Sequence, residues 1–172
     1  MKNYILTHSE FFLVQAEMQS RESYFVPPAE PMNAIPKDVE NLYFCGYKSG
    51  DEMTVLKFAS YGFTQLRSIT IGSICFMNAR EFVLDGLEKL EYISLNSDHI
   101  DTKSENPMQG TEKHADGVCQ ITNCPSLRKL DVGDSSFRWY ERFELSNVNS
   151  LQSVNFGRKC FEHVNECVLK GK

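Results

Sequence analysis

Six cysteines are the residues of this 172-residue chain that are best suited to chemistry. No two of them form a C-x-x-C pair, the spacing typical of many zinc sites. An even number of cysteines indicates a disulfide framework only in short secreted chains. A catalytic thiol needs a histidine nearby, and Cys160 with His163 is the best local pair. A thiol-dependent enzyme that uses this pair is therefore one hypothesis for the function.

A second group of reactive side chains lies between residues 98 and 116. It consists of Asp98, His99, Asp101, His114 and Asp116. These are acceptable metal ligands, but no fixed spacing relates them, and such groups are common in solvated loops. A metal-binding protein that uses this segment is the other chemical alternative.

Three solitary glycines follow short apolar runs: Gly72, Gly133 and Gly157. A phosphate-binding loop needs several glycines that lead into a helix, and neither glycine-rich fingerprint is present. We therefore expect no cofactor, no metal and no enzymatic activity.

Charge and hydropathy exclude several partners. The net charge is -5, and no run of Lys and Arg supplies the basic face of a general nucleic-acid binder. No apolar stretch approaches the about 18 residues that cross a bilayer. The N-terminal "MKNYILTHSEFFLV" is too interrupted by polar residues for a secretory signal. These features favour a cytoplasmic protein that neither binds nucleic acid nor spans a membrane.

An internal repeat places the glycines and cysteines. "LRSITIGSICFMNAREFVLDG" returns as "LRKLDVGDSSFRWYERFELSN" and as "LQSVNFGRKCFEHVNECVLKG". The period is 24 residues, and one copy carries a polar insertion at about 101–117. The copies begin at Leu42 (a degraded copy), Leu66, Leu90, Leu127 and Leu151. One such unit cannot bury its apolar face alone, so the units must stack.

Two alternating apolar pairs in each unit predict two short strands with one buried face. The first strand carries Ile69/Ile71, Ile93/Leu95, Leu130/Val132 and Val154/Phe156. The second carries Phe82/Leu84, Cys119/Ile121, Phe143/Leu145 and Cys167/Leu169. Stacked units would form two parallel sheets with a spine of phenylalanines between them: Phe58, Phe63, Phe76, Phe82, Phe137, Phe143, Phe156 and Phe161.

Glycine and asparagine exchange in two columns of the repeat, which predicts left-handed corners. The columns are Gly72, Asn96, Gly133, Gly157 and Gly86, Asn123, Asn147, Gly171. All six cysteines also fall on repeat positions. Cys45 falls in the strand slot of Ile69, and we expect the cysteines to be small buried side chains.

The pattern Leu-x-x-apolar-x-apolar at 24 residues resembles the leucine-rich repeat family over about 42–172. The continuation "IG…CF…F-x-L-x-G" looks like the irregular, two-stranded repeats of large protist proteins and bacterial surface-antigen-like proteins. The resemblance implies a curved β-rich solenoid of about five 24-residue units. It also implies recognition of a protein or a glycan. The family's usual turn asparagine is replaced by Ile74, Asp98, Ser135 and Lys159.

The two ends of the chain differ from the repeat. Residues 1–38 are expected to form an N-terminal cap, with a helix after Thr7-x-x-Glu10 and a proline-rich connector, ahead of the solenoid at 39–172. No cap is visible after "VLKGK", which indicates a portion of a longer array or end-to-end self-association. A truncated product without independent function is a further alternative.

The side chains that alternate with the buried pairs predict the binding face, because they must point outward. One column is Phe44, Ser68, Tyr92, Lys129 and Ser153, and the next is Gly46, Thr70, Ser94, Asp131 and Asn155. Aromatic residues and a lysine among small polar ones are typical of a modest recognition surface. We therefore expect a non-enzymatic protein-interaction or scaffold module with an unidentified protein partner.

Overall fold

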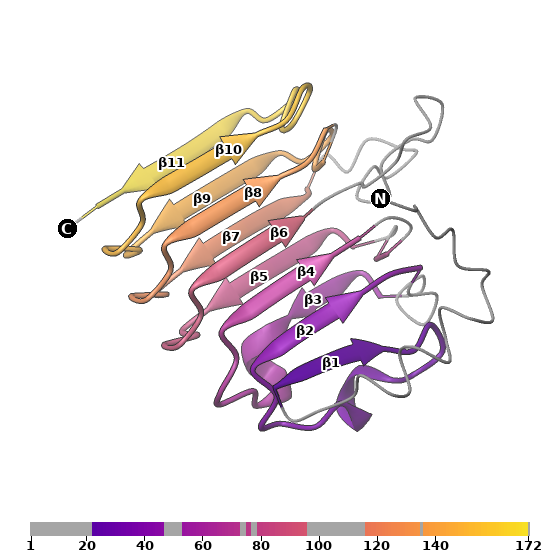
Figure 1. Ribbon diagram of the computed structural model, residues 1–172. Helices are drawn as coiled ribbons and strands as arrows, with labels where there is room; N and C mark the ends of the chain where they lie inside the picture. Colours follow the sequence, from indigo (N-terminus) through magenta and orange to yellow (C-terminus); the bar gives the residue numbers. More distant parts are fainter. Residues whose placement is uncertain are drawn as a thin grey trace, which may run out of the picture.

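The protein is a stack of two sheets of parallel strands, seen in a computed structural model that describes residues 22–46, 53–72, 75–76, 79–95, 116–134 and 136–171 (Figure 1). The six-stranded sheet contains β1 (Ser23–Val26), β2 (Asn41–Phe44), β4 (Ser68–Ile71), β6 (Tyr92–Leu95), β8 (Lys129–Val132) and β10 (Ser153–Phe156). The five-stranded sheet contains β3 (Val55–Lys57), β5 (Glu81–Asp85), β7 (Val118–Thr122), β9 (Arg142–Ser146) and β11 (Glu166–Lys170). The prediction of two parallel sheets is confirmed.

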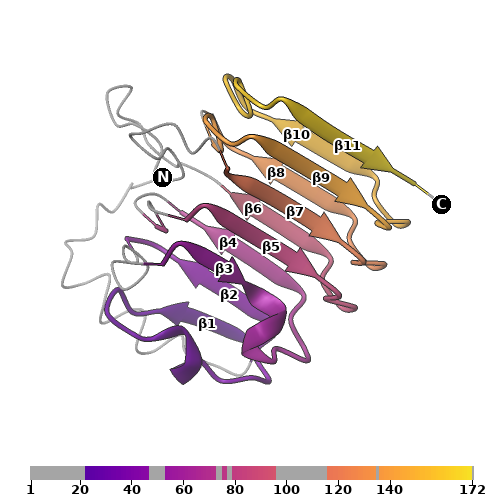
Figure 2. The same ribbon diagram turned by 180° about the vertical axis from the view of Figure 1, so that it is seen from behind.

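From β2 onward the chain alternates between the sheets, so that each strand pairs with the next strand of its own sheet one unit later. Figure 2, seen from behind, shows the five-stranded sheet on the side that faces the viewer, with the six-stranded sheet beyond it. Two short 3-10 helices, η1 (Met32–Ala34) and η3 (Phe58–Tyr61), lie near the N-terminal end. The predicted helix after Thr7 lies outside the described residues, as does most of the insertion at 101–117.

The register follows the predicted columns over most of the chain. Ile69 pairs with Ile93, and Phe143 pairs with Cys119 on one side and Cys167 on the other. All the inward positions from β4 to β9 are buried. Alternation of apolar side chains therefore predicted which face of each strand packs inward.

The predicted phase of the first unit is wrong. Leu42 pairs with Ile69 and Phe44 with Ile71, so both side chains point into the core. Cys45 follows the end of β2 and is exposed, which also overturns its expected burial in a strand. The step from Asn41 to its neighbour Ser68 is 27 residues, not 24.

A continuous row of aromatic rings fills the space between the sheets. Phe44 lies 5.2 Å from Phe76 and 6.2 Å from Phe58, as measured between ring centroids. Further rings continue the row through Phe82, Phe137, Phe161, Phe143 and Phe156. Six of the eight predicted phenylalanines are buried, whereas Phe161 is half-buried and Phe156 is exposed.

One of the two Gly/Asn columns has the expected conformation. Gly86, Asn123 and Asn147 have φ of 68°, 52° and 53°, in the left-handed region, whereas Gly171 does not. Their position ends the second strand of each unit. Because Asn tolerates this region better than other side chains, it replaces Gly here at little cost.

The prediction of left-handed corners is wrong for the column that contains Gly72 and Gly157. Neither Gly72 nor Gly157 has a left-handed φ. A Cβ at Gly157 would lie 2.5 Å from the backbone nitrogen of Asp134, and one at Gly72 would lie 3.2 Å from the Phe44 carbonyl oxygen. At Gly157 the backbone of the preceding unit passes too close for a side chain, whereas at Gly72 it leaves only a tight fit.

The left-handed residues of this turn are instead the phenylalanines. Phe76, Phe137 and Phe161 have φ of 55°, 52° and 52°. In each turn the Phe carbonyl accepts a hydrogen bond from the amide three residues later, in Ala79, Tyr140 and Val164. This conformation costs a bulky residue about 1–2 kcal/mol, and burial of the ring offsets that cost.

The two ends of the stack differ. Met32, Ile35 and Val39, which precede β2, are buried at the N-terminal end. β1 lies in the segment 1–38 that was expected to form a cap, and it pairs in parallel with β2 and extends the sheet. At the other end, the inward side chains of β10 and β11 are largely exposed.

Candidate functional site

The outer side of the six-stranded sheet, here called the front face, is formed by the outward side chains of its strands. The register places these residues in two columns: Ser23, Asn41, Ser68, Tyr92, Lys129, Ser153 and Phe25, Tyr43, Thr70, Ser94, Asp131, Asn155. Eight of the predicted binding residues lie on it: Ser68, Thr70, Tyr92, Ser94, Lys129, Asp131, Ser153 and Asn155. Phe44 does not, because it is buried in the core, and Gly46 lies beyond β2.

Asp131 is the centre of a polar cluster on β6, β8 and β10. Its carboxylate oxygens accept hydrogen bonds from Tyr92 Oη at 3.1 Å and Asn155 Nδ2 at 2.6 Å. Lys129 Nζ lies 2.6 Å from Asp131 Oδ2 and 5.3 Å from the centre of the Tyr92 ring. Lys129 therefore makes an ion pair and a cation–π contact at once, which fixes the long side chain over the sheet.

These contacts change the ionisation of the cluster. Partial burial disfavours the charged form of Asp131, but the hydrogen bonds from Lys129, Asn155 and Tyr92 outweigh it and lower the pKa of the carboxyl. The hydrogen bond to Asp131 in turn raises the pKa of Lys129. The cluster is thus held as a fixed pair of opposite charges beside a tyrosine ring at neutral pH.

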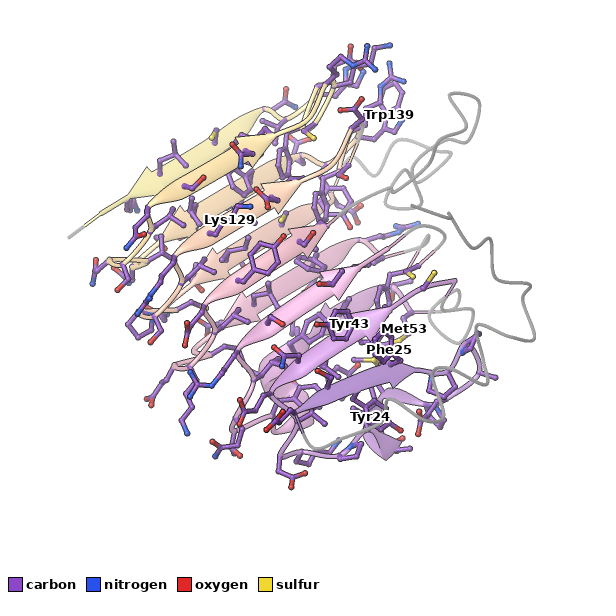
Figure 3. The ribbon with its side chains drawn as sticks, in the orientation of Figure 1. Tyr24, Phe25, Tyr43, Met53, Lys129 and Trp139 are labelled. Carbon is purple, nitrogen blue, oxygen red and sulfur yellow. The ribbon has the colours of Figure 1, made fainter. Side chains whose placement is uncertain are left out.

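An aromatic pair lies at the other end of the front face. Phe25 of β1 and Tyr43 of β2 stack with ring centroids 4.6 Å apart and planes 14° apart (Figure 3). The sequence did not identify either residue. Phe25 precedes the recognised repeat, and Tyr43 was assigned to the wrong column by the error of three residues in the first unit. The alternation of Leu42 and Phe44 in "NLYF" was the available signal.

Small polar side chains separate the aromatic pair from the Asp131 cluster. Ser68 and Thr70 on β4 are half-buried, and Ser94 on β6 is buried although it lies in an outward column. Ser68 Oγ lies 2.6 Å from Asn41 Oδ1 and donates to it. Neighbouring strands are about 4.8 Å apart, so the small side chains of β4 leave a shallow strip about one strand wide between larger side chains. This strip is here called the floor of the front face.

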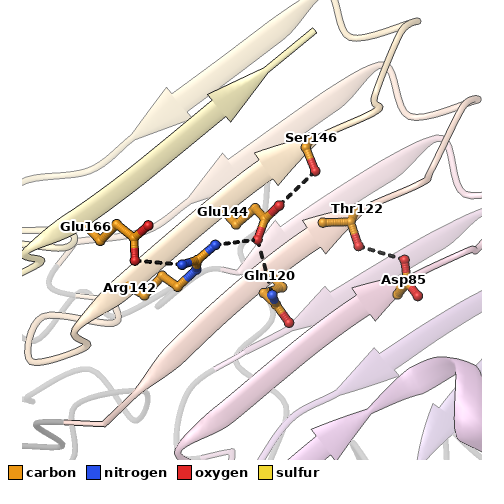
Figure 4. A network of polar contacts seen from close by, with 7 residues as sticks. All are labelled: Asp85, Gln120, Thr122, Arg142, Glu144, Ser146 and Glu166. Carbon is orange, nitrogen blue, oxygen red and sulfur yellow. Dashed lines mark hydrogen bonds and ion pairs between the residues drawn. The ribbon is translucent and has the colours of Figure 1, made fainter. Parts of the chain in front are cut away.

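The outer side of the five-stranded sheet, here called the rear face, carries a second polar network that the sequence did not reveal (Figure 4). Glu144 accepts hydrogen bonds from Arg142 at 3.0 Å, Gln120 at 3.2 Å and Ser146 at 3.1 Å. Arg142 also bonds Glu166 at 2.6 Å. The hydrogen bond from Arg142 is the largest cause of the lowered pKa of Glu144.

Beside Glu144, Asp85 bonds Thr122 at 2.6 Å and Asn123 at 2.8 Å. The two groups line a shallow depression of about 360 Å³, together with Val83, Gln120, Ser146 and Asn147. Its polar atoms largely satisfy one another, and it contains no aromatic side chain. The rear face is therefore a less suitable recognition surface than the front face.

The cysteines differ in burial, and Cys160 is half-buried. Cys75, Cys119 and Cys124 are buried as expected. Burial raises the pKa of Cys119, and it raises that of Cys124 to about 11. Cys167 has the predicted register beside Phe143, yet it is exposed because β11 is the edge strand of its sheet among the described residues.

The structure places the proposed thiol and histidine in separate contacts. Cys160 Sγ lies 2.7 Å from the Gly133 carbonyl oxygen, to which it can donate. The His163 ring stacks on Trp139, with centroids 4.0 Å apart and planes 1° apart. Of the candidate metal ligands, Asp116 alone lies in the described part of the chain, and it pairs with Arg80 at 3.6 Å. Within that part, no group of three His, Cys, Asp or Glu residues could hold a metal ion.

Comparison with known proteins supplies no relative. No protein-family model, curated protein or solved structure matches the chain. Among the residues that the structure describes, no helix is long and apolar enough to span a membrane. The function is therefore inferred from the side chains of the two outer faces.

Proposed function

We propose that this chain is a non-enzymatic protein-interaction module that binds its partner through the front face. We further propose that the two sheets form a leucine-rich-repeat-like solenoid of about five units, as part of a scaffold. The observation that carries the proposal is the pairing of a stacked aromatic pair, Phe25 and Tyr43, with the fixed Tyr92–Lys129–Asp131 cluster across a floor of small residues.

The composition of this face supports a protein partner. Aromatic residues that present large contact areas with few rotatable bonds are enriched at interface centres. Phe25 and Tyr43 are held by stacking, and Lys129 is held by Asp131 and Tyr92, so little side-chain entropy would be lost on binding. The fixed charges of Lys129 and Asp131 would select the orientation of the partner.

The repeat supports the solenoid. Side-chain hydrogen bonds join residues separated by 24 positions on both sheets, as between Asn155 and Asp131 and between Arg142 and Glu166. Each unit thus meets its neighbour through equivalent positions of the repeat, which is the organisation of stacked repeats.

Site-specific photocrosslinking tests the binding face. A photoreactive amino acid is placed at Thr70, in the floor of the front face, and in a matched variant at Thr122, an outward threonine of the rear face. The proposal predicts a discrete protein adduct in cells from the Thr70 variant alone. Adding Tyr43→Ala and Lys129→Ala should abolish that adduct. Equal adducts from both positions, or none from Thr70, would contradict a front-face partner.

A further inference from the structure

The last strand of each sheet exposes apolar side chains that point inward elsewhere in the stack. Val154, Phe156 and Leu169 are 37%, 48% and 66% exposed. Their register neighbours one unit earlier are 0%, 4% and 7% exposed: Leu130, Val132 and Leu145. β10 and β11 are also the outermost strands of the two sheets, so each presents an edge of backbone hydrogen-bonding groups.

At the opposite end of the stack the inward side chains are covered, although β1 and β3 are also edge strands of their sheets. Val26 of β1 and Leu56 of β3 are 1% and 0% exposed, and the segment before β2 buries Met32 and Ile35 against the core. A head-to-tail contact would therefore bring the exposed apolar side chains of β10 and β11 against an end whose apolar side chains are already buried. Two apolar ends can cover each other only when both copies use the same surface, which gives a closed two-fold pair and not a filament.

We propose that two copies of this chain pair edge to edge through β10 and β11. A two-fold axis normal to the sheets relates the copies, so each strand meets its own equivalent in an antiparallel arrangement. The partner is thus a second copy of the chain, bound through the backbone edges of β10 and β11 and not through the outward side chains of the front face.

Side-chain charge selects the register of β11. An antiparallel pair centred on Val168 places Glu166 of one copy opposite Lys170 of the other, twice over. Glu166 already bonds Arg142 of β9 at 2.6 Å. The charges would then alternate across three strands, from Arg142 to Glu166 to Lys170 of the second copy.

The same axis fits β10. Phe156 lies 5.7 Å from Phe143, the β9 neighbour of Cys167, so Phe156 is level with Cys167 and Asn155 with Val168. A pair centred on Asn155 places Val154 opposite Phe156 of the second copy, and both point inward. A single two-fold axis therefore lets both strands pair with their equivalents in the second copy. The pairing covers the exposed apolar residues of both strands and satisfies both backbone edges.

Cross-linking at the axis is the most direct test. Val168→Cys would place two thiols on directly opposed residues, about 4.5–5.5 Å apart at Cα, within the range that a disulfide spans. Val83→Cys is the matched control, because Val83 occupies the same column in β5, inside the sheet. Both variants carry Cys45→Ser and Cys167→Ser, which remove the two exposed native thiols. Under mild oxidation we expect a covalent dimer from Val168→Cys alone.

Association is then measured by sedimentation equilibrium over a hundredfold range of concentration. The native chain should dimerise, and Leu169→Lys should be monomeric. Glu166→Lys and Lys170→Glu should each weaken the dimer, since like charges then face each other, and the double variant should recover it. A chain that stays monomeric over the whole range overturns the proposal. So does a dimer that fails to cross-link at Val168, or a charge-swapped double variant that does not recover.

Discussion

Phe137 and Phe161 stack face to face, with ring centroids 5.2 Å apart and planes 5° apart. Both residues have the same left-handed φ of 52°, and the amide of Phe161 donates to the carbonyl of Ser136 at 3.2 Å. Two successive turns therefore repeat the same conformation, and each ring is positioned by the ring below it.

Removal of the Phe137 ring should be strongly destabilising. The ring is fully buried and contacts Phe82, Tyr140 and Phe161. Phe137→Ala should lower the free energy of unfolding by roughly 3–5 kcal/mol, the range for large-to-small core changes. Urea denaturation measures this. A loss below about 1 kcal/mol would show that the ring does not support the core.

Gly157 and Gly171 should respond differently to the same added methyl group. A Cβ at Gly157 would lie 2.5 Å from the Asp134 backbone nitrogen, whereas one at Gly171 would have no atom within 4 Å. Gly157→Ala should therefore cost about 1–3 kcal/mol, and Gly171→Ala should leave the unfolding midpoint unchanged. Equal effects in thermal denaturation would contradict the close backbone approach at Gly157.

Acid should weaken the front face through Asp131. Its folded pKa is lowered below the ordinary value of 3.8, so the folded state binds the proton less tightly than the unfolded state does. The resulting stability is present above the ordinary pKa and is lost as the pH falls through the lowered one. Asp131→Asn should therefore lose less stability than the native chain between neutral and acidic pH. Unfolding at each pH tests this, and salt should reduce the difference, because the site is near the surface.

Thiol alkylation followed by mass spectrometry should separate the cysteines. Cys45 and Cys167 are exposed and should react rapidly in the native protein. Cys119 and Cys124 are buried with raised pKa, so both should react only on unfolding. We expect Cys160 to react slowly, since its thiol contacts Gly133. Rapid labelling of Cys160 would favour the alternative of a thiol-dependent enzyme.

The sequence predicted the inward faces of the strands well, because alternation has a period of two and burial of one face follows directly from it. It located eight front-face residues for the same reason. It misplaced Phe44 because three additional residues lie between β2 and β4. A shift by an odd number exchanges the inward and outward positions of a strand, yet the shifted pattern still alternates, so the sequence did not reveal the error.

Other features depend on distances that no local pattern records. A glycine that avoids a neighbouring backbone and a glycine with a left-handed φ look alike in sequence, so Gly157 was assigned the wrong role. The aromatic pair of Phe25 and Tyr43 and the Arg142–Glu144 network depend on the register between strands. Their residue types alone gave no reason to bring them together.

The hydrogen bonds between residues 24 positions apart have a consequence for how this chain can change in length. Asn123 and Asn147 share one backbone conformation and are joined directly at 2.8 Å. Excision of the segment between two such corners would bring together strands that already match. Changes of other lengths fall in the connections between strands, as in the 27-residue step from Asn41 to Ser68, which keeps the inward side chains of β2 buried. Duplication or loss of a whole unit is therefore a change of length that keeps both the strand pairing and the hydrogen bonds between the corners.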